Sequence, residues 1–150
     1  MMTDALLQLS TAQAVTASAV STNTIDLSTS RDVGAGEDLY ATFTVGVTAT
    51  AAGAATVDFQ VITSAAADLS SPTVIGTSGP IPKADLTLGR KPFSICINSS
   101  ILLAQPIGQR YLGVQYVVVT GPLTAGSFSC AITDTDVGGP KYYASGFTVA

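Results

Sequence analysis

Side chains capable of acid–base or nucleophilic chemistry are few in this sequence and are scattered along it. The chain contains ten acidic residues, two cysteines and no histidine. Without histidine, the commonest general base and the Ser–His and Cys–His nucleophile pairs are missing. Two carboxylates could still cleave a glycosidic bond, but the acids fall mostly in expected turns, where a solvated carboxylate is the ordinary finding. We therefore expect no catalytic residues and no enzyme activity.

Two short motifs resemble ligand sites but lack essential members. The segment DTDVGG at 134–139 has the first two acids of a calcium loop, without the next oxygen ligand or the distal Glu. The segment GAGEDL at 34–39 has two glycines of a phosphate-binding loop, but it lacks the third and leads into a strand pattern. We therefore expect no metal ion and no cofactor.

The two cysteines, Cys96 and Cys130, each lie between apolar or small neighbours in strand-like segments. Both are expected to be small buried core residues with reduced thiols. A disulfide between them is the alternative, because paired strands can bring two cysteines together. Two cysteines do not make the disulfide framework of a small secreted domain, and the opening residues do not read as a secretion signal, so we expect folding in a reducing cytoplasm.

The composition excludes several classes of partner and favours another. Charged residues make up only 11% of the chain, whereas about 25% is usual. The net charge is −4 and the six basic residues are dispersed, so nucleic acid is not expected to bind directly. No apolar run approaches the ~18 residues of a membrane helix. So little charge in such an apolar chain predicts extensive contacts with other proteins.

Alternation of apolar and polar residues predicts strands along most of the chain. In LYATFTVGVTA, residues 39–49, the odd positions form one apolar face that includes Val47. The same period occurs in 56–63 and 127–133, and weaker strands are expected at 14–20, 22–28, 72–78 and 93–97. The segment YLGVQYVVVT at 111–120 is apolar on both faces, which predicts a strand covered on both sides.

Turns rich in glycine and proline separate these strands, and no linker between domains stands out. About eight short strands at this spacing predict a single all-β domain over 1–150, an antiparallel β-sandwich of jelly-roll type. Residues 1–12 are expected to form an N-terminal arm or a short helical turn capped by Thr3 or Asp4.

The C-terminal tail, residues 138–150, is unusually aromatic for a chain end. It carries Tyr142, Tyr143 and Phe147 after a Gly-Gly-Pro break. One interpretation is a last strand that closes the sandwich. The other, which we favour, is an arm that packs on a neighbouring molecule, because aromatic side chains bury much area for few lost rotamers.

Apolar side chains outside the expected core face identify the candidate contacts with a partner. We expect a homo-oligomer, most simply a dimer, because the core of a single chain can bury only one of the two apolar faces of 111–120. The expected partner contacts are Leu6, Leu9, Val117, Val119, Tyr142, Tyr143 and Phe147.

Several stretches, taken in order, resemble a known family. They are TDALLQLSTAQAVTASAVSTNTIDLS, GAGEDLYATFTV, GAATVDFQVITSAAADLSSPTVIGTSGPIP, RYLGVQYVVVTGPLTAG and KYYASGFTVA. Together they cover most of the chain, and the ordered set is similar to the jelly-roll capsid cement (decoration) proteins of tailed, mainly short-tailed, bacteriophages. The stretch KPFSICINSSILLAQPIGQ is longer than the link that the family usually has there.

The resemblance implies a non-enzymatic virion protein, made in the host cytoplasm and placed on the outer surface of a phage head. Such a protein binds across neighbouring major capsid protein subunits and resists the pressure of the packaged DNA. The alternative is a receptor- or carbohydrate-binding jelly roll of a tail fibre or spike. Sugar-binding platforms favour exposed aromatic residues, above all Trp, and this chain has no Trp.

Overall fold

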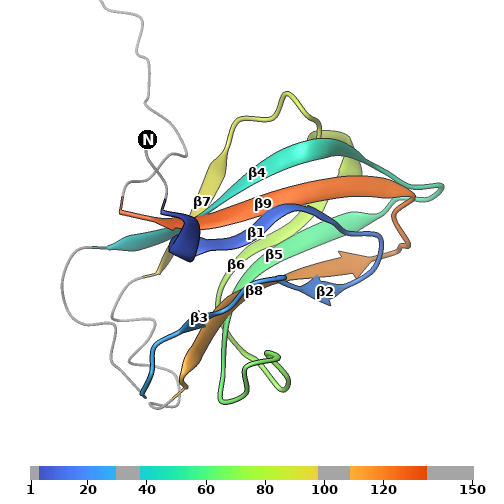
Figure 1. The fold of residues 1–150 in the computed structure, drawn as a ribbon. Helices are drawn as coiled ribbons and strands as arrows, with labels where there is room; N and C mark the ends of the chain where they lie inside the picture. The colour runs from blue at the N-terminus through green and yellow to red at the C-terminus, as the bar shows by residue number, and fades with distance from the viewer. Residues whose placement is uncertain (1–3, 30–37, 98–108, 135–150) are drawn as a thin grey trace, which may run out of the picture.

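Strands make up nearly all the regular structure in the part of the chain that the structure describes (Figure 1). The computed structural model describes residues 4–29, 38–97 and 109–134. Within these ranges the only helical elements are two three-residue 3-10 turns, η1 (Ala5–Leu7) and η2 (Lys83–Asp85). The strands are β1 (Gln8–Ala14), β2 (Ala19–Val20), β3 (Ile25–Asp26), β4 (Leu39–Thr50), β5 (Thr56–Ser64), β6 (Thr73–Pro82), β7 (Phe93–Ile97), β8 (Tyr111–Val119) and β9 (Ala125–Thr133).

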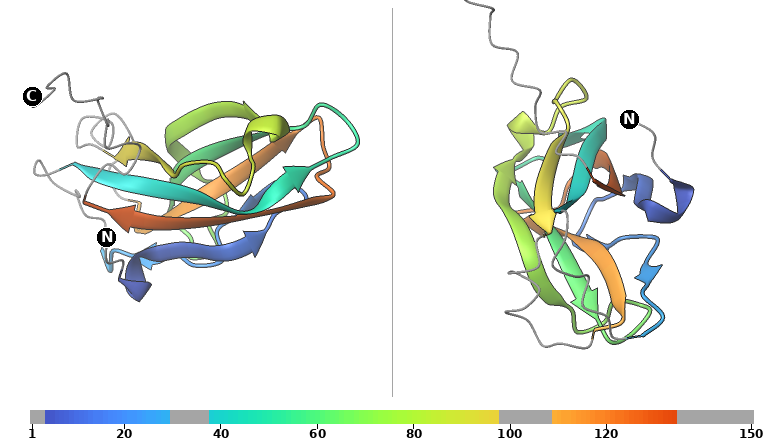
Figure 2. Two further views of the ribbon diagram at one scale, coloured as in Figure 1. Left: turned by 90° about the horizontal axis from the view of Figure 1, so that it is seen from above. Right: turned by 90° about the vertical axis from the view of Figure 1, so that its left-hand side faces the viewer.

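The strands form two antiparallel sheets that pack face to face, as the two further views show (Figure 2). Sheet A has the order β1-β9-β4-β7, and sheet B has the order β2-β8-β5-β6, with β3 also pairing with β8. Along the chain, the strands pass from one sheet to the other except between β2 and β3 and at the β5–β6 hairpin. This alternation is the jelly-roll arrangement of two Greek keys, so the expected fold class is confirmed.

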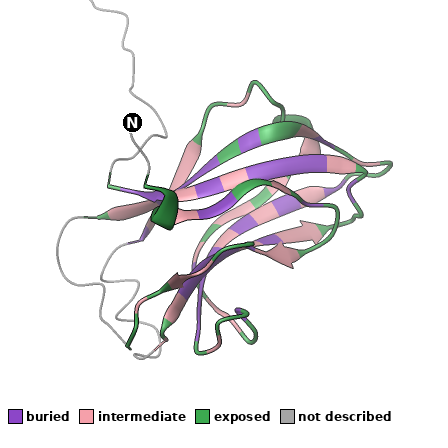
Figure 3. Ribbon diagram, in the orientation of Figure 1, coloured by how far each residue is buried: buried purple, intermediate pink, exposed green. Residues whose placement is uncertain are grey.

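The core between the sheets is built around aromatic rings. Phe59 of sheet B lies with its ring centroid 5.2 Å from that of Phe43 and 5.0 Å from that of Phe128, both in sheet A. Tyr116 lies 5.6 Å from both Phe59 and Phe128, and all four side chains are fully buried. Most of these pairs are edge-to-face, which is a favourable geometry for packed aromatic rings. Buried residues alternate with partly buried and exposed ones along the central strands (Figure 3).

The odd-numbered residues of β4 pack on the core as predicted, except Val47. Ala41, Phe43 and Val45 are buried, but Val47 is 50% exposed, so its expected place on the core face is wrong. The pairing of β4 with β9 shifts between Val45 and Val47 and again between Val47 and Thr50, so Val47 turns outward whereas Ala49 lies in the core again. Gly46 permits the close approach, because a Cβ there would lie 2.8 Å from the Ser127 Oγ.

The short N-terminal turn capped by Asp4 is found, but the remainder of the arm or turn expected at 1–12 is not, because Gln8–Ala14 forms strand β1 of sheet A. Asp4 caps η1 by accepting a hydrogen bond from the Leu6 amide at 2.9 Å. The two segments that follow also differ from the prediction. The range 14–20, where one strand was expected, contains the last residue of β1, a connection and the two-residue β2. In the range 22–28, only the two residues of β3 are in a strand. The chain changes sheets in this region, and the connection bonds to the β8–β9 loop, where the Leu123 amide donates to the Thr16 carbonyl.

The other weak strand predictions agree better with the structure. The strand β7 has the expected limits, 93–97, and β6 continues beyond the predicted 72–78 to Pro82. The strand β6 lies at the edge of sheet B, and an edge tolerates the prolines at 80 and 82 that cannot donate to a neighbouring strand.

The strand β8 is covered on both faces by its own chain only near its start. Leu112, Val114 and Tyr116 face the core, and Leu69 of the β5–β6 loop packs over Gly113 on the outer side. Towards the other end Val119 is 51% exposed. The prediction that both faces of this strand are covered is therefore wrong for the C-terminal end of β8. No other segment that the structure describes covers Val119 there.

Candidate functional site

The acidic side chains that the structure describes are dispersed, and those with the best-defined bonds have structural roles. In the ranges 4–29, 38–97 and 109–134, no group of three His, Cys, Asp or Glu side chains could hold a metal ion. Most of the DTDVGG motif lies outside the described residues, as does most of GAGEDL. The two carboxylates with the most defined partners are Asp58 and Asp26.

Asp58 fastens two neighbouring strands of sheet B. Its Oδ1 accepts hydrogen bonds from the Thr77 hydroxyl at 2.6 Å and the Ser78 hydroxyl at 3.3 Å, and its Oδ2 accepts one from the Gln60 amide at 2.8 Å. The pairing of β5 with β6 is irregular between Asp58 and Gln60. These bonds take the place of regular ladder contacts there, so the carboxylate stabilises the irregular pairing.

Asp26 pairs with Arg110 where β3 meets the start of β8. The Arg110 Nε and Nη2 donate to the two carboxylate oxygens at 2.6 and 2.7 Å. This bidentate pairing, followed by the hydrogen bond from the Ser28 amide, lowers the pKa of Asp26 to about 2. Both side chains are nearly half exposed, so the pair fixes a surface connection and is screened by salt.

The two cysteines occupy different environments and form no disulfide. Cys130 faces the core, is 1% exposed, and has a thiol pKa raised by burial. Cys96 is only partly buried, which corrects the expectation that it is a core residue. The inward positions of β7 are taken by Phe93, Ile95 and Ile97, so the alternation turns Cys96 to the outer side of sheet A.

The structure separates the residues expected to contact a partner. Leu6 in η1 is 83% exposed and Val119 is 51% exposed, but Leu9 has no exposed surface. Leu9 belongs to the core cluster and cannot reach a partner while the fold is intact, so it is removed from the candidate contacts. Val117 is partly buried. Tyr142, Tyr143 and Phe147, with the whole segment 138–150, lie outside the described residues.

The remaining exposed candidates do not form one patch. Leu6 precedes β1, whose first residue pairs with Ala131 near the end of β9, whereas Val119 ends β8 just before the loop into the start of β9. They therefore lie towards opposite ends of the sandwich, as the course of β1, β8 and β9 shows in Figure 1. A single flat partner surface would not contact both.

The outer face of sheet A is a surface that strand patterning alone did not identify. None of its four strands contains Asp, Glu, Lys or Arg. The side chains that point outward carry no charge. Most are small or hydroxyl-bearing (Thr42, Thr44, Ser94, Cys96, Ser129, Ala131 and Thr133), and the larger ones include Tyr40, which pairs with Cys96 and Thr133, and the exposed Val47. The absence of charge in each strand was readable from the sequence, but the fact that these four strands share one sheet was not.

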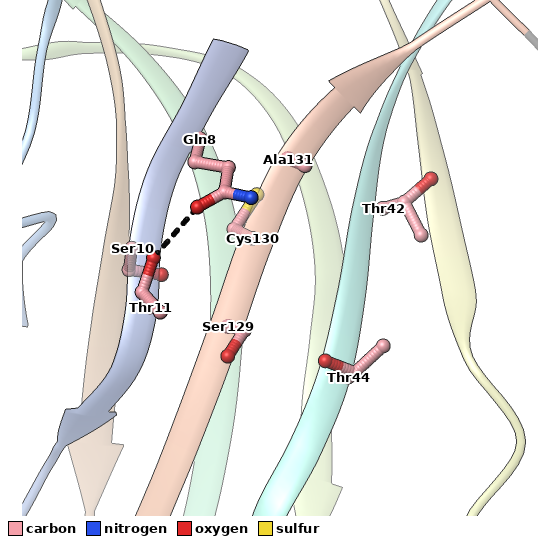
Figure 4. Close-up of a pocket in the computed structure, with 8 residues that line it drawn as sticks. All are labelled: Gln8, Ser10, Thr11, Thr42, Thr44, Ser129, Cys130 and Ala131. Atoms are coloured by element: carbon pink, nitrogen blue, oxygen red, sulfur yellow. Dashed lines mark hydrogen bonds between the residues drawn. The ribbon is translucent and has the colours of Figure 1, made fainter. Parts of the chain in front are cut away.

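A shallow hollow lies on this face between β1, β9 and β4 (Figure 4). Its volume is about 200 Å³. It is lined by Gln8, Ser10, Thr11, Thr42, Thr44, Ser129, Cys130 and Ala131. The lining is uncharged, and the Thr11 hydroxyl donates to the Gln8 side-chain oxygen at 3.0 Å. The hollow therefore offers hydroxyl and amide groups and no charge or aromatic ring.

No helix in the described ranges is long and apolar enough to cross a membrane.

A known protein family matches this chain. The model of the Bbp16 family matches residues 9–132, which include all but the first residue of β1 and all but the last residue of β9. No curated protein matches the chain.

Proposed function

The chain belongs to the Bbp16 family, and from that premise we propose that it is a structural protein of a bacteriophage virion. In this proposal it binds the outer surface of the phage head and cements neighbouring major capsid protein subunits against DNA pressure. It is made in the host cytoplasm and acts without catalysis or cofactors. The ordered segments that resemble capsid cement proteins support this assignment, because they extend over most of the jelly roll.

The observation that carries the proposal is the complete lack of charge in the four strands of sheet A. A soluble protein that functions alone usually has charged residues spread over its whole surface. A wide uncharged face suits many weak contacts repeated over a symmetric lattice, where multivalency supplies the total affinity.

The packing of the sandwich also suits a clamp. The aromatic rings of Phe43, Phe59, Tyr116 and Phe128 fill the space between the sheets with centroids 5.0 to 6.4 Å apart. A close-packed core resists deformation and transmits strain from one face to the other. A protein that links capsid subunits under outward pressure needs this stiffness.

The alternative is a carbohydrate- or receptor-binding jelly roll, and the hollow of Figure 4 is the feature that favours it. Its hydroxyl and amide groups could bond to a sugar. However, no aromatic side chain lines the hollow, and sugar rings usually stack on one. We therefore rank this function second.

The two functions can be separated by one pair of binding experiments. The purified protein is mixed with expanded phage heads that lack cement protein, and heads with bound protein are recovered by sedimentation. Saturable binding and a higher temperature of DNA release are expected for a cement protein. Heads already covered with cement protein are the control. Binding to a glycan array, with no binding to the bare heads, would support the alternative instead.

A further inference from the structure

We propose that the connection from β6 to β7, residues 83–92, is a docking surface for an acidic segment of another protein. This inference deepens the proposed function and rests on it, because on a phage head the segment would belong to the major capsid protein. The connection contains Lys83, Arg90 and Lys91, which are three of the six basic residues of the chain. It runs along the edge of the sandwich that β6 and β7 form (Figure 1).

Hydrogen bonds and burial give this connection a defined position on the sandwich. It passes beside the part of β4 that follows the pairing with β7, where the Ala49 amide donates to the Leu86 carbonyl at 2.9 Å. Leu86 is fully buried, so its side chain holds the segment against the core. The turn that follows is closed by the Arg90 amide, which donates to the Thr87 carbonyl at 2.9 Å. The cationic side chains therefore start from a fixed backbone.

Two of the three cationic side chains are positioned by neutral groups of the same chain. The Arg90 Nη1 donates to the Asp85 carbonyl at 3.0 Å, and the guanidinium lies 5.0 Å from the centroid of the Phe93 ring. The Lys83 ammonium donates to the Ala51 carbonyl. These contacts restrict the side chains but leave their charges uncompensated, because a carbonyl and an aromatic ring carry no net charge. A positioned cation loses little rotamer freedom when it binds a carboxylate.

The distribution of charge favours an acidic partner. The connection has three basic residues and one acid, Asp85, so its net charge is +2, although the chain as a whole has −4. Within the described ranges, the ion pair is that of Asp26 with Arg110, and none involves a residue of the connection. An acidic partner attracts this edge and repels the remainder of the molecule, which orients the approach of the two proteins.

An exposed apolar side chain lies between these cations in the sequence. Leu88 is 65% exposed, and its amide donates to the Thr48 hydroxyl of β4 at 3.0 Å. The residue before Thr48 is Val47, which is 50% exposed on the outer side of sheet A, so the edge continues into the uncharged face. An apolar tip flanked by cations fits carboxylates placed around an apolar pocket, as a protein surface can provide. The phosphates of a nucleic acid backbone offer no such pocket, so a protein is the better match.

The test changes the charge and the apolar tip separately, with expanded heads that lack cement protein as the probe. Lys91→Glu should raise the dissociation constant for the heads at least about tenfold, because attraction becomes repulsion. Lys91→Arg keeps the charge and should change the constant by less than about threefold. Leu88→Gln should raise the constant about fivefold through lost apolar burial. Val74→Gln makes a similar change at a 41% exposed position near the start of β6 and should leave the constant unchanged.

Carbodiimide cross-linking tests the chemistry of the contact directly. The reagent couples a lysine amine to a carboxylate as an amide and takes up the released water as a urea. It should therefore join the Lys91 Nζ to an Asp or Glu side chain of the major capsid protein, and peptide mass spectrometry identifies the two residues. In Lys91→Arg this link should be absent although the protein still binds. Thermal melting confirms that every variant is folded.

The outcomes separate this inference from the cement function. If the heads bind the wild type, Lys91→Glu and Leu88→Gln equally well, the inference is overturned and the cement function stands. A wild type that binds no heads overturns the cement function, and with it the capsid protein as the partner of this surface. Binding of the wild type to duplex DNA that is lost in Lys91→Glu would also overturn the inference, because the connection would then recognise phosphates.

Discussion

The hydroxyl of Ser10 in β1 lies 2.5 Å from the phenolic oxygen of Tyr116 in β8, and this hydrogen bond joins the two sheets through the core. Ser10 is 1% exposed and Tyr116 is fully buried, so neither group has water as an alternative partner. Tyr116 reaches from sheet B between Phe59 and Phe128. This hydrogen bond therefore links β1 of sheet A to β8 of sheet B through a cluster of apolar side chains.

Removing one partner of this bond should destabilise the fold measurably. Tyr116→Phe leaves the Ser10 hydroxyl buried without a partner, and Ser10→Ala leaves the phenol without one, so each should lower the free energy of unfolding by about 1–3 kcal/mol. The double variant removes both polar groups and should cost less than the sum of the single changes. Urea denaturation measures all three, and additive losses would show that the two side chains are not coupled.

Alkaline pH should weaken the fold through the same tyrosine and the neighbouring thiol. Burial, followed by the proximity of Cys130, raises the pKa of Tyr116 above its usual value of 10.0, although the Ser10 hydrogen bond acts in the opposite direction. Burial also raises the pKa of Cys130 above 9.0. Because the unfolded chain ionises first, stability is fully present below about pH 9 and falls as pH rises further.

The melting temperature should therefore be level up to about pH 9 and then decline, and the pH at which the decline begins identifies the residues responsible. In Cys130→Ala the decline should begin nearer pH 10, because only the phenol remains to be ionised on unfolding. In Tyr116→Phe the loss of stability relative to wild type should shrink as pH rises above 10. An identical pH profile in all three proteins would rule out this explanation.

The cysteines should differ in their reactivity towards a thiol reagent. Cys130 is almost fully buried and held protonated, so it should react only after unfolding. Cys96 is partly exposed on the outer side of sheet A and should react in the folded protein. Labelling with a chromogenic disulfide reagent should thus give about one fast thiol per chain and a second in denaturant. Loss of the fast thiol in Cys96→Ser would confirm which residue reacts.

Low pH should break the ion pair between Asp26 and Arg110, because the carboxylate becomes protonated. The pKa of Asp26 is lowered to about 2 from 3.8 by the Arg110 hydrogen bonds and then the Ser28 amide. A lowered carboxyl pKa contributes stability that is present above the unfolded value and disappears as pH falls through the folded value. Asp26→Asn should therefore melt below wild type at pH 7, and the difference should shrink below about pH 4 and vanish only below about pH 2.

Salt provides the control for this pair. Both side chains are nearly half exposed, so moderate salt should reduce the difference between wild type and Asp26→Asn at pH 7. Asp68 is a useful comparison, because its pKa is lowered by the Ser70 amide and the Ser70 side chain without an arginine. A salt-insensitive difference at Asp26 would show that the hydrogen-bond geometry matters more than the charge.

The strands with the strongest alternation were predictable from sequence, and the departures have identifiable causes. In β5, Val57, Phe59 and Val61 face the core as the period-two pattern indicates. Val47 does not, because the register of β4 shifts against a partner strand about 80 residues further along the chain, and such a shift depends on tertiary pairing. Local patterning cannot predict it.

The candidate surface was only partly predictable for a related reason. Exposure of Leu6 and burial of Leu9 depend on where η1 ends and β1 begins pairing with β9. The uncharged face requires knowing that β1, β9, β4 and β7 are neighbours, although they lie far apart in the sequence. The composition indicated protein contacts, but the topology was needed to locate a surface for them.

The packing of Leu69 on Gly113 gives the final prediction, which concerns the β5–β6 loop. Leu69 is 1% exposed with a φ of 57°, a conformation that costs energy for a leucine. Two hydrogen bonds hold the loop in this conformation. The Leu69 amide donates to the Ala66 carbonyl, and the Ser64 hydroxyl donates to the carbonyl of the next residue, Ser70. The loop therefore holds one apolar side chain against the outer side of β8, at a position where only glycine leaves room.

Gly113→Ala should displace this loop and lower stability by about 1–3 kcal/mol, the usual cost of overpacking. The added Cβ would lie 2.3 Å from the Leu69 Cδ1 and 3.1 Å from the Ser21 Oγ, so the leucine must move. Limited proteolysis should then cut within 65–72, where we expect the wild type to resist cleavage because Leu69 is buried. In a Leu69→Ala background the same glycine change should cost much less, because the obstructing side chain is gone. If Gly113→Ala is equally harmful with and without Leu69, the clash lies with the β8 backbone or Ser21, and the loop is not the element that requires this glycine.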